Sequence, residues 1–269
     1  MNFKSYQIFP LHTKAFLIEW EQEPSEALLE KLILFKSIIE KEPKVTKCLM
    51  GYKSLIVNLA EEIMNLNWWR EHLKKLQEKI HEKKYINGKQ WKIPVCYDPK
   101  YAPDITFLAK RLKLNIDELI QLHTKTIYRL YFIGFLPGFL YLGGLNKSLH
   151  YPRKKKPQLK VPRGSVGIGG KQTGIYPCNS PGGWHLIGNT PLKLFDVTKQ
   201  PPCFANSGDW ISFEAIDQDT YKDLEKKIQK GDFKFDALLL KSLTMEFILA
   251  YRIWVVTTFK LLEFQFQEL

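Results

Sequence analysis

The hydrophobic and polar positions in the first part of the chain alternate between two periods. Two segments carry apolar residues at helical spacing, and each predicts an amphipathic helix. They are Leu28, Leu32, Phe35 and Ile39 in the first, and Trp69, Leu73, Leu76 and Ile80 in the second. Short apolar runs predict strands over residues 15–20, 44–49, 54–59 and 90–97. This order, βαββαβ, predicts an α+β domain with a ferredoxin-like split βαβ, in which both helices cover one face of an antiparallel sheet.

The pattern changes after residue 100. Two short helices are predicted over residues 105–112 and 116–122, the first capped by Asp104 and the second by an Asn115–Glu118 capping box. From Tyr128 onward the helical period disappears, and glycine and proline recur every few residues. The apolar runs there are short, and they predict the strands of an all-β, closed or nearly closed barrel. These runs are residues 130–135, 166–168, 184–187, 192–195 and 210–213.

The same pattern divides the chain into three parts. Residues 1–98 are expected to form the ferredoxin-like domain. Residues 99–234 are expected to form the barrel with its helical lead-in, because Pro99 and Pro103 bracket a short polar link. The apolar tail, residues 235–269, is expected to be a packed helix, with an interfacial or partner-binding helix as the alternative. Charged residues interrupt its apolar runs, so no transmembrane segment is expected.

Composition narrows the class of protein. A chain of 269 residues that is 45% hydrophobic can bury a substantial core. The four cysteines lie far apart without a Cys-x-x-Cys pair, which argues against a zinc site and a disulfide framework. With no signal-peptide pattern at the N-terminus, a cytoplasmic protein is expected.

The net charge of +12 would suit an anionic partner, although most lysines are interspersed with glutamates. The densest basic cluster is residues 153–156, continued by Lys160 and Arg163 with no acidic residue between them. No recognised nucleic-acid module accompanies this cluster, so a nucleic-acid partner is not expected. Two interpretations remain: a solvated loop, or a loop that meets an acidic partner or an anionic substrate.

A glycine-rich run at residues 164–177, GSVGIGGKQTGIYP, invites comparison with nucleotide-binding motifs. A P-loop requires Gly-x-x-x-x-Gly-Lys-Ser/Thr followed by a helix. Gly170 and Lys171 fit, but Ser165 stands at the first glycine and Gln172 at the hydroxyl position. Gly174 and Pro177 leave no room for a helix. The run also lacks a dinucleotide fingerprint and a Gly-x-Ser-x-Gly nucleophile elbow, so it requires a different explanation.

Residues 135–145, FLPGFLYLGGL, resemble the "GFLPGFxYLxGL" of the KipI and allophanate hydrolase subunit 1 family, also called carboxyltransferase subdomains C and D. Residues 161–196 closely resemble the family's "VPAGSVGIAGxQTGIYPxxSPGGWxLIGRTPxxLFD", and shorter matches extend into the first hundred residues. The resemblance implies a ferredoxin-like N-terminal domain and a cyclophilin-like β-barrel C-terminal domain.

The resemblance also implies a function. Members work with a KipA or allophanate hydrolase subunit 2-like subunit. In prokaryotes the pair is similar to the B and C subunits of the ATP-dependent 5-oxoprolinase, which act with an A subunit to open 5-oxoproline to L-glutamate. The chain is therefore expected to be a B subunit that is inactive alone, with ATP and Mg²⁺ acting at the level of the complex. Two alternatives are an inhibitor of a sensor histidine kinase, and a component of an allophanate hydrolase or urea carboxylase.

Opening a lactam with ATP calls for groups that hold anions around a small polar substrate. Backbone N–H groups of the glycine-rich run could form an anion-binding nest, and the turn at residues 180–184 could add further N–H donors and an indole. His123, placed just before the barrel by the family match, is expected to act as a general acid–base, or else to fill a packing role. Gln172 and Tyr176 complete the expected catalytic residues. The expected substrate or anion ligands are Arg153, Ser165, Gly167, Gly170, Thr173, Gly182, Gly183 and Trp184, and no metal ligand is expected.

Three positions depart from the family's motifs. Gln158 stands where the family often has arginine, and Asn189 stands where it has arginine or lysine before Thr-Pro. Loss of these cations would weaken anion binding. Arg163 replaces a small residue and could restore one cation.

Overall fold

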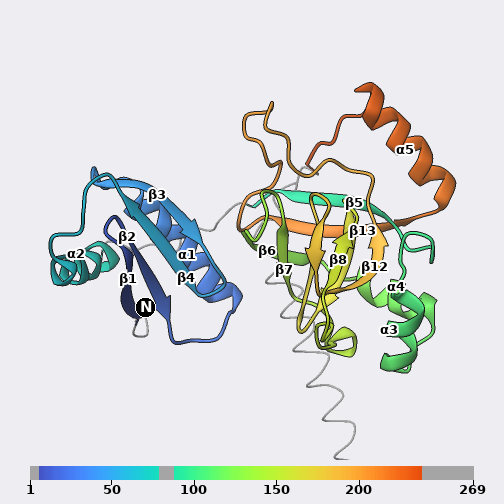
Figure 1. The fold of residues 1–269 in the computed structure, drawn as a ribbon, viewed down its shortest axis with the longest axis horizontal. Coiled ribbons are helices and arrows are strands. Elements are labelled where there is room, and N and C mark those ends of the chain that lie inside the picture. Colours follow the sequence, from blue (N-terminus) through green and yellow to red (C-terminus); the bar gives the residue numbers. More distant parts are fainter. Residues whose placement is uncertain (1–5, 79–87, 238–269) are drawn as a thin grey trace, which may run out of the picture. The chain divides into compact units, whose positions relative to one another are not determined.

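The computed structural model describes residues 6–78 and 88–237 (Figure 1). The first range holds an α+β region with an antiparallel sheet, and the second holds a closed β-barrel with three α-helices. Most of the predicted C-terminal tail, from residue 238 onward, lies outside the described residues.

The N-terminal region is a four-stranded antiparallel sheet in the order β1-β2-β4-β3. Its elements are β1 (Tyr6–His12), β2 (Ala15–Trp20), α1 (Glu26–Ile39), β3 (Val45–Met50), β4 (Ser54–Leu59) and α2 (Leu66–Glu78). The hydroxyl of Ser25 accepts the Leu28 N–H at 3.2 Å and so caps the start of α1. Strand residues on one sheet face, such as Phe16 and Val57, are buried with the apolar faces of both helices. The predicted helical periods therefore form this core.

The sequence-based assignment of the fourth strand was wrong. Residues 90–96 do form a strand, β5 (Gln90–Cys96), but it pairs with two strands of the barrel and none of the N-terminal sheet. The fourth place in the N-terminal sheet is taken by β1, which pairs with β2 and which the pattern did not predict. Leu192 and its neighbours are not a strand either, since only Phe195 forms an isolated bridge, with Cys203.

The barrel closes in the order β10-β7-β6-β13-β5-β12-β9, and β5 and β13 run parallel while the other pairs are antiparallel. Its strands beyond β5 are β6 (Tyr128–Ile133), β7 (Leu140–Gly143), β9 (Ser165–Gly169), β10 (Gln172–Ile175), β12 (His185–Asn189) and β13 (Trp210–Ile216). A separate two-stranded sheet is formed by β8 (Gln158–Val161) and β11 (Ser180–Gly182). Inward-facing side chains such as Ile93, Leu130 and Ile187 fill the barrel, so it encloses a packed core.

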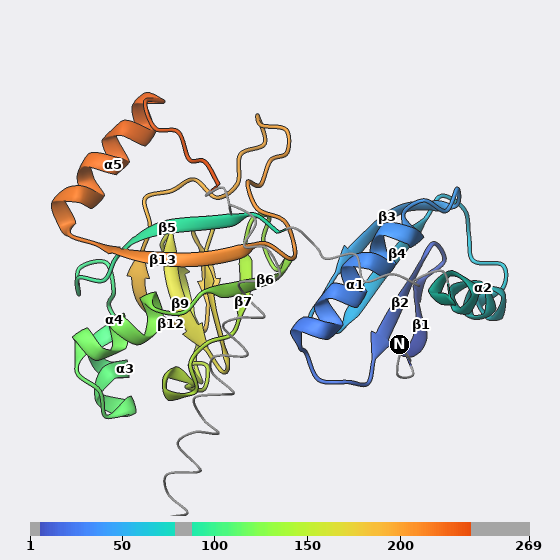
Figure 2. The same ribbon diagram turned by 180° about the vertical axis from the view of Figure 1, so that it is seen from behind.

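Helices α3 (Ile105–Leu112) and α4 (Ile116–Thr124) lie together below the barrel in Figures 1 and 2, and α5 (Gln218–Lys230) lies above it. The Asn115–Glu118 capping box at the start of α4 is confirmed. Asp104 precedes α3 but makes no side-chain cap, because its carboxylate instead accepts the Leu186 N–H at 2.7 Å and pairs with Lys154 at 2.6 Å. The sequence pattern did not predict α5.

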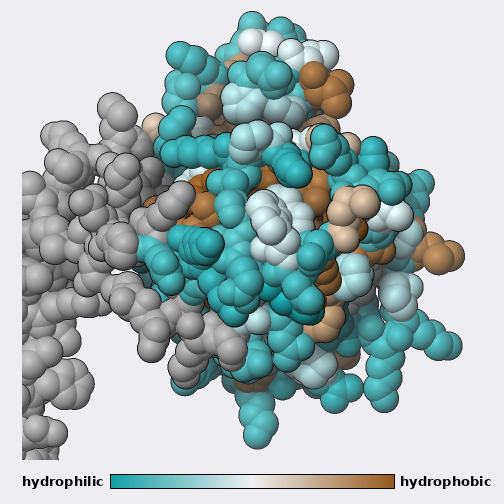
Figure 3. Space-filling model, turned by 90° about the vertical axis from the view of Figure 1, so that its left-hand side faces the viewer, coloured by the Kyte–Doolittle hydropathy of each residue, from teal (hydrophilic) through white to brown (hydrophobic). Residues whose placement is uncertain are grey.

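The face of the molecule in Figure 3 is mostly hydrophilic, with hydrophobic surface confined to smaller areas between polar side chains. In the described parts of the chain, no helix has the length and apolar character needed to cross a lipid bilayer.

Candidate functional site

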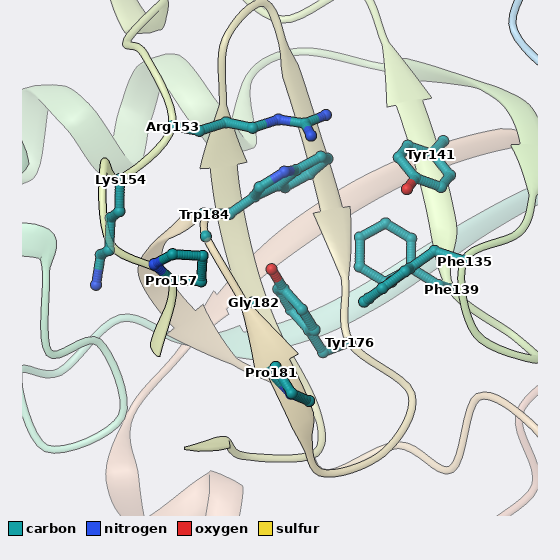
Figure 4. Close-up of a pocket in the computed structure, with 11 residues that line it drawn as sticks. Phe135, Phe139, Tyr141, Arg153, Lys154, Pro157, Tyr176, Pro181, Gly182 and Trp184 are labelled. Carbon is teal, nitrogen blue, oxygen red and sulfur yellow. The ribbon is translucent and has the colours of Figure 1, made fainter. Parts of the chain in front are cut away.

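A pocket of about 330 Å³ opens on the barrel beside β7 and β11 (Figure 4). Tyr141 reaches it from β7, Tyr176 from just beyond β10, and Trp184 from the link between β11 and β12. The remaining lining residues come from the loops before β7 and β8, from β11 and from the residue that follows β11. They are Phe135, Phe139, Arg153, Lys154, Pro157, Pro181, Gly182 and Gly183.

The pocket wall is an aromatic cluster whose rings meet at steep angles. The Phe139 ring lies 5.0 Å from Tyr176 and 5.5 Å from Trp184 in edge-to-face contacts. The Tyr141 ring lies 5.9 Å from Trp184 in the same arrangement. Such contacts add to hydrophobic burial and hold each ring in one orientation. The wall is therefore rigid and presents flat apolar faces with two phenol hydroxyls.

Three glycines make room for these rings. A Cβ on Gly169 would lie 2.6 Å from the Trp184 indole, and one on Gly174 would lie 2.5 Å from the Leu140 carbonyl oxygen and 3.0 Å from the same indole. A Cβ on Gly182 would lie 2.4 Å from the Tyr176 hydroxyl. The glycine-rich sequence is explained here by the bulk of Trp184 and Tyr176, since any larger residue at these positions would displace an aromatic wall.

The polar side chains of the pocket are two cations, Arg153 and Lys154, and two phenols, and the Lys154 charge is already paired with Asp104. The Arg153 guanidinium lies over the Trp184 indole at 5.6 Å, and Figure 4 shows the two side chains extended alongside one another. Burial raises the pKa of the hydroxyls of Tyr141 and Tyr176. Both phenols are therefore protonated at neutral pH and can donate hydrogen bonds. The site is suited to a small planar ligand that carries one negative charge.

Two glycines of the predicted backbone nest lie in or beside the barrel strands β9 and β10. Gly167 lies in β9 and is paired across the ladder with Gly174 of β10. The Gly170 N–H, at the turn between these strands, donates to the Tyr151 carbonyl at 2.7 Å. The Gly170 N–H therefore already has a partner within the barrel, and anion binding by the other N–H groups of the run stays a prediction.

His123 lies in the barrel core and is fully buried. The Thr173 hydroxyl donates to the Gly167 carbonyl, so the His123 Nε2–H donates to Thr173 Oγ1 at 3.0 Å. The Tyr97 hydroxyl then donates to Nδ1 at 2.8 Å, which satisfies both ring nitrogens of a neutral imidazole. Burial lowers the pKa of His123 to about 3. This geometry supports the packing role that the sequence left open, and it holds Thr173 in the same network.

The other predicted site residues lie outside the pocket lining. Ser165 is buried in β9, and its backbone carbonyl accepts the Tyr176 N–H at 2.9 Å. Gln172 is half-buried in β10, and its Oε1 is buried without a partner among the described residues. Of the eleven predicted positions, five line the pocket: Arg153, Tyr176, Gly182, Gly183 and Trp184.

Sequence reasoning missed the other half of the pocket. Phe139 and Tyr141 stand two residues apart in the motif that carried the resemblance, so they share one side of an extended chain. That alternation of aromatic residues was the available signal. Lys154 belongs to the basic cluster for which a solvated loop was one interpretation, but its ammonium pairs with Asp104 and its side chain is only 16% exposed.

Two departures from the family motifs are coupled in space. The Asn189 amide donates to the Arg163 carbonyl at 2.9 Å and accepts the Tyr221 hydroxyl at 2.8 Å. Arg163 in turn donates to the Leu192 carbonyl at 3.2 Å. Asn189 therefore links the loop before β9 to α5, and Arg163 is bound to backbone away from the pocket.

The family model described as "Carboxyltransferase domain, subdomain C and D" matches residues 6–205, which include every residue that lines the pocket. The chain belongs to this carboxyltransferase C and D family. The two motifs that carried the resemblance meet at the pocket, since residues 135–145 supply Phe139 and Tyr141 and residues 161–196 supply Tyr176 and Trp184.

Individual members of the carboxyltransferase C and D family resemble the chain over most of its length. It is 36% identical over 229 residues to the 5-oxoprolinase B subunit of Bacillus subtilis, covering 80% of this chain and 95% of that protein. It is 38% identical over 190 residues to the 5-oxoprolinase B subunit of Escherichia coli O157:H7, covering 69% and 82%.

Two solved structures share the fold. The crystal structure of TTHA0988 matches with a TM-score of 0.65 at 29% identity, covering 77% of this chain and 40% of that one. The urea amidolyase of K. lactis matches with a TM-score of 0.73 at 17% identity, covering 88% of this chain and 17% of that one. The second likeness concerns the fold alone.

Proposed function

We propose that this chain is the B subunit of an ATP-dependent 5-oxoprolinase, opening 5-oxoproline to L-glutamate together with A and KipA-like C subunits. The observation that carries the proposal is the similarity to the 5-oxoprolinase B subunit of Bacillus subtilis over 95% of the length of that protein. A protein of this kind is one part of a multisubunit enzyme, so the chain acts within a complex and is inactive alone. Its place in the cell is the cytoplasm.

The chemistry of the pocket supports this substrate. 5-Oxoproline is a small five-membered lactam with one carboxylate. The rings of Phe139 and Trp184 would cover the lactam ring, and the Arg153 guanidinium would bind the carboxylate through paired hydrogen bonds. The Tyr176 hydroxyl, protonated because burial raises its pKa, would donate to the lactam oxygen. In this arrangement the chain orients the substrate and polarises its amide, while ATP with Mg²⁺ acts at the level of the complex.

We assign a named fold to each of the two regions on the basis of the family resemblance. We propose that the N-terminal region is a ferredoxin-like domain and that the barrel is cyclophilin-like. Because β5 pairs with β12 and β13, we propose that the barrel domain begins before Gln90 and not at residue 99.

The test is ATP-dependent release of glutamate from 5-oxoproline by the purified chain mixed with its cognate A and C subunits, with each of the three proteins omitted in turn. We expect full activity only when this chain is present. Glutamate release that persists without it would overturn the assignment as the B subunit.

Replacing Arg153 with alanine is expected to raise the KM for 5-oxoproline by about tenfold or more at saturating ATP, because the carboxylate loses a charge-assisted partner worth about 1.5–3 kcal/mol. Arg153→Lys should restore part of this binding. Lys160→Ala is the matched control, since Lys160 is an exposed cation on β8 outside the pocket lining. An unchanged KM in Arg153→Ala would remove this residue from the substrate site.

A further inference from the structure

A second pocket, of about 690 Å³, lies on the other side of the loop that carries Arg153 and Lys154. These two residues line both pockets, so a single stretch of chain forms a shared wall. The remaining lining comes from α3 with its cap, from the same loop and from β12. These residues are Asp104, Phe107, Arg111, Tyr151, Pro152, Lys155, Lys156 and His185.

The charge of this pocket is strongly positive. Its lining holds two arginines and three lysines against a single carboxylate, that of Asp104. That carboxylate is already neutralised, because it pairs with Lys154 at 2.6 Å and accepts the Leu186 N–H. Arg111 on α3 and the exposed pair Lys155 and Lys156 have no acidic partner among the described residues, and they approach the pocket from two different elements. Cations brought together from separate elements create a potential that favours a multiply charged anion.

Flat aromatic surface lies between these cations. The Phe107 ring stacks on His185 at 5.7 Å with an interplanar angle of 16°, and its side chain is 44% exposed. The Arg111 guanidinium lies over Phe107 at 5.3 Å, and Tyr151 meets His185 edge to face at 5.1 Å. Such a surface can accept a planar ring by stacking while the neighbouring cations hold its charged groups.

His185 supplies an independent observation that points to a ligand. Its side chain is 5% exposed, and its Nε2–H donates to the Pro152 carbonyl at 3.1 Å. The Nδ1 atom on the other side of the ring is buried without a hydrogen-bond partner among the described residues. Buried polar atoms without partners are costly, so they call for an explanation. Burial lowers the pKa of His185, so its Nδ1 stays an unprotonated acceptor, and a ligand hydroxyl could donate to it.

We propose that this second pocket binds an oligophosphate, held by Arg111, Lys155 and Lys156 beside the Phe107 and His185 rings. If the ligand is a nucleotide, its base stacks on Phe107. Only the role of the ligand rests on the proposed function. In that role the ligand is the ATP of the 5-oxoprolinase reaction, and it binds on the opposite side of the shared wall from the lactam. Binding itself is a property of this chain alone.

The experiment measures binding to the full 269-residue chain by isothermal titration calorimetry, with ATP and inorganic triphosphate as the two probes. We expect both to bind, and Lys155→Ala/Lys156→Ala to weaken both by at least about tenfold. Phe107→Ala should weaken ATP alone, if the base stacks, and leave triphosphate unchanged. Equal affinities for the two probes would assign the site to the phosphates, and tighter binding of ATP would assign it to a nucleotide.

Matched controls come from α3 and from the strand that follows the lysine-bearing loop. Lys110 on α3 and Lys160 on β8 are exposed lysines outside the pocket lining, so Lys110→Ala/Lys160→Ala removes the same charge and should leave binding within about twofold. No binding of either probe, or equal loss in both double variants, would overturn the proposal. The titration needs only this chain, so its outcome is independent of whether glutamate release requires this chain.

Discussion

Gly182→Ala is expected to reduce glutamate release by the reconstituted complex by more than about tenfold, and to lower the free energy of unfolding by about 1–3 kcal/mol. The added Cβ would lie 2.4 Å from the Tyr176 hydroxyl and 2.7 Å from two of its ring carbons. Tyr176 is buried against Phe139 and is held by β11 on the other side, so it cannot move without disturbing the pocket wall. The methyl group therefore displaces the phenol that we propose as donor to the lactam oxygen.

The neighbouring glycine is the matched control. A Cβ on Gly183 would find its closest neighbours at 3.8 and 4.0 Å, which is ordinary contact distance. Both glycines line the pocket, so Gly183→Ala tests whether a methyl group in this turn is harmful in itself. We expect it to retain activity within about threefold of the parent. Equal losses in the two variants, or full activity in Gly182→Ala, would contradict the assigned role of Tyr176.

His123→Asn is expected to lower the free energy of unfolding at pH 8 by about 2–4 kcal/mol, because it removes the bond to Thr173 and part of a stacked ring while keeping an acceptor for Tyr97. The cost should shrink in acid. Burial lowers the pKa of His123 from 6.5 in the unfolded chain to about 3 in the folded protein, so below pH 6.5 the unfolded state binds a proton that the folded state does not. The stability contributed by the neutral ring is therefore complete above pH 6.5 and is lost as pH falls towards 3.

Denaturant unfolding of both proteins at pH 8 and pH 5 measures this effect. Each pH unit in that window is worth about 1.4 kcal/mol, so the difference between the two proteins should fall by about 2 kcal/mol at pH 5. Groups common to both proteins cancel in the comparison. A difference that is the same at both pH values would mean that His123 can be protonated in the folded state, and would reopen its role as an acid–base.

Local chemistry made several elements predictable from the sequence. The helical period of α1 and the capping box of α4 depend on residues a few positions apart, and the structure shows both. The strands that contain Phe16 and Val57 were predicted for the same reason, because the alternation of buried and less buried positions along a strand involves adjacent residues. The family could also be recognised from the sequence, because each of its two motifs is one continuous stretch of residues.

The strand with which a given strand pairs is not predictable from such local patterns. β5 has the period of a strand, but its place in the barrel depends on parallel pairing with β13, whose register joins Gln90 to Trp210. No local pattern encodes a partner so distant in the chain, so the sequence placed this strand beside its nearest neighbours instead. β1 was missed for the complementary reason, because most of its positions are partly or fully exposed and its apolar pattern is weak.

The candidate site also has features that the sequence predicted and features that only the tertiary structure revealed. The sequence by itself predicted several residues that line the pocket, among them Arg153, Tyr176 and Trp184. Only the tertiary structure showed that Gly182 leaves space for the Tyr176 side chain and that His123 is a buried hydrogen-bond partner of Tyr97 and Thr173. The physical reason is that a side chain's type is local, whereas its burial, its pKa and its neighbours are set by residues that folding brings together from distant parts of the chain.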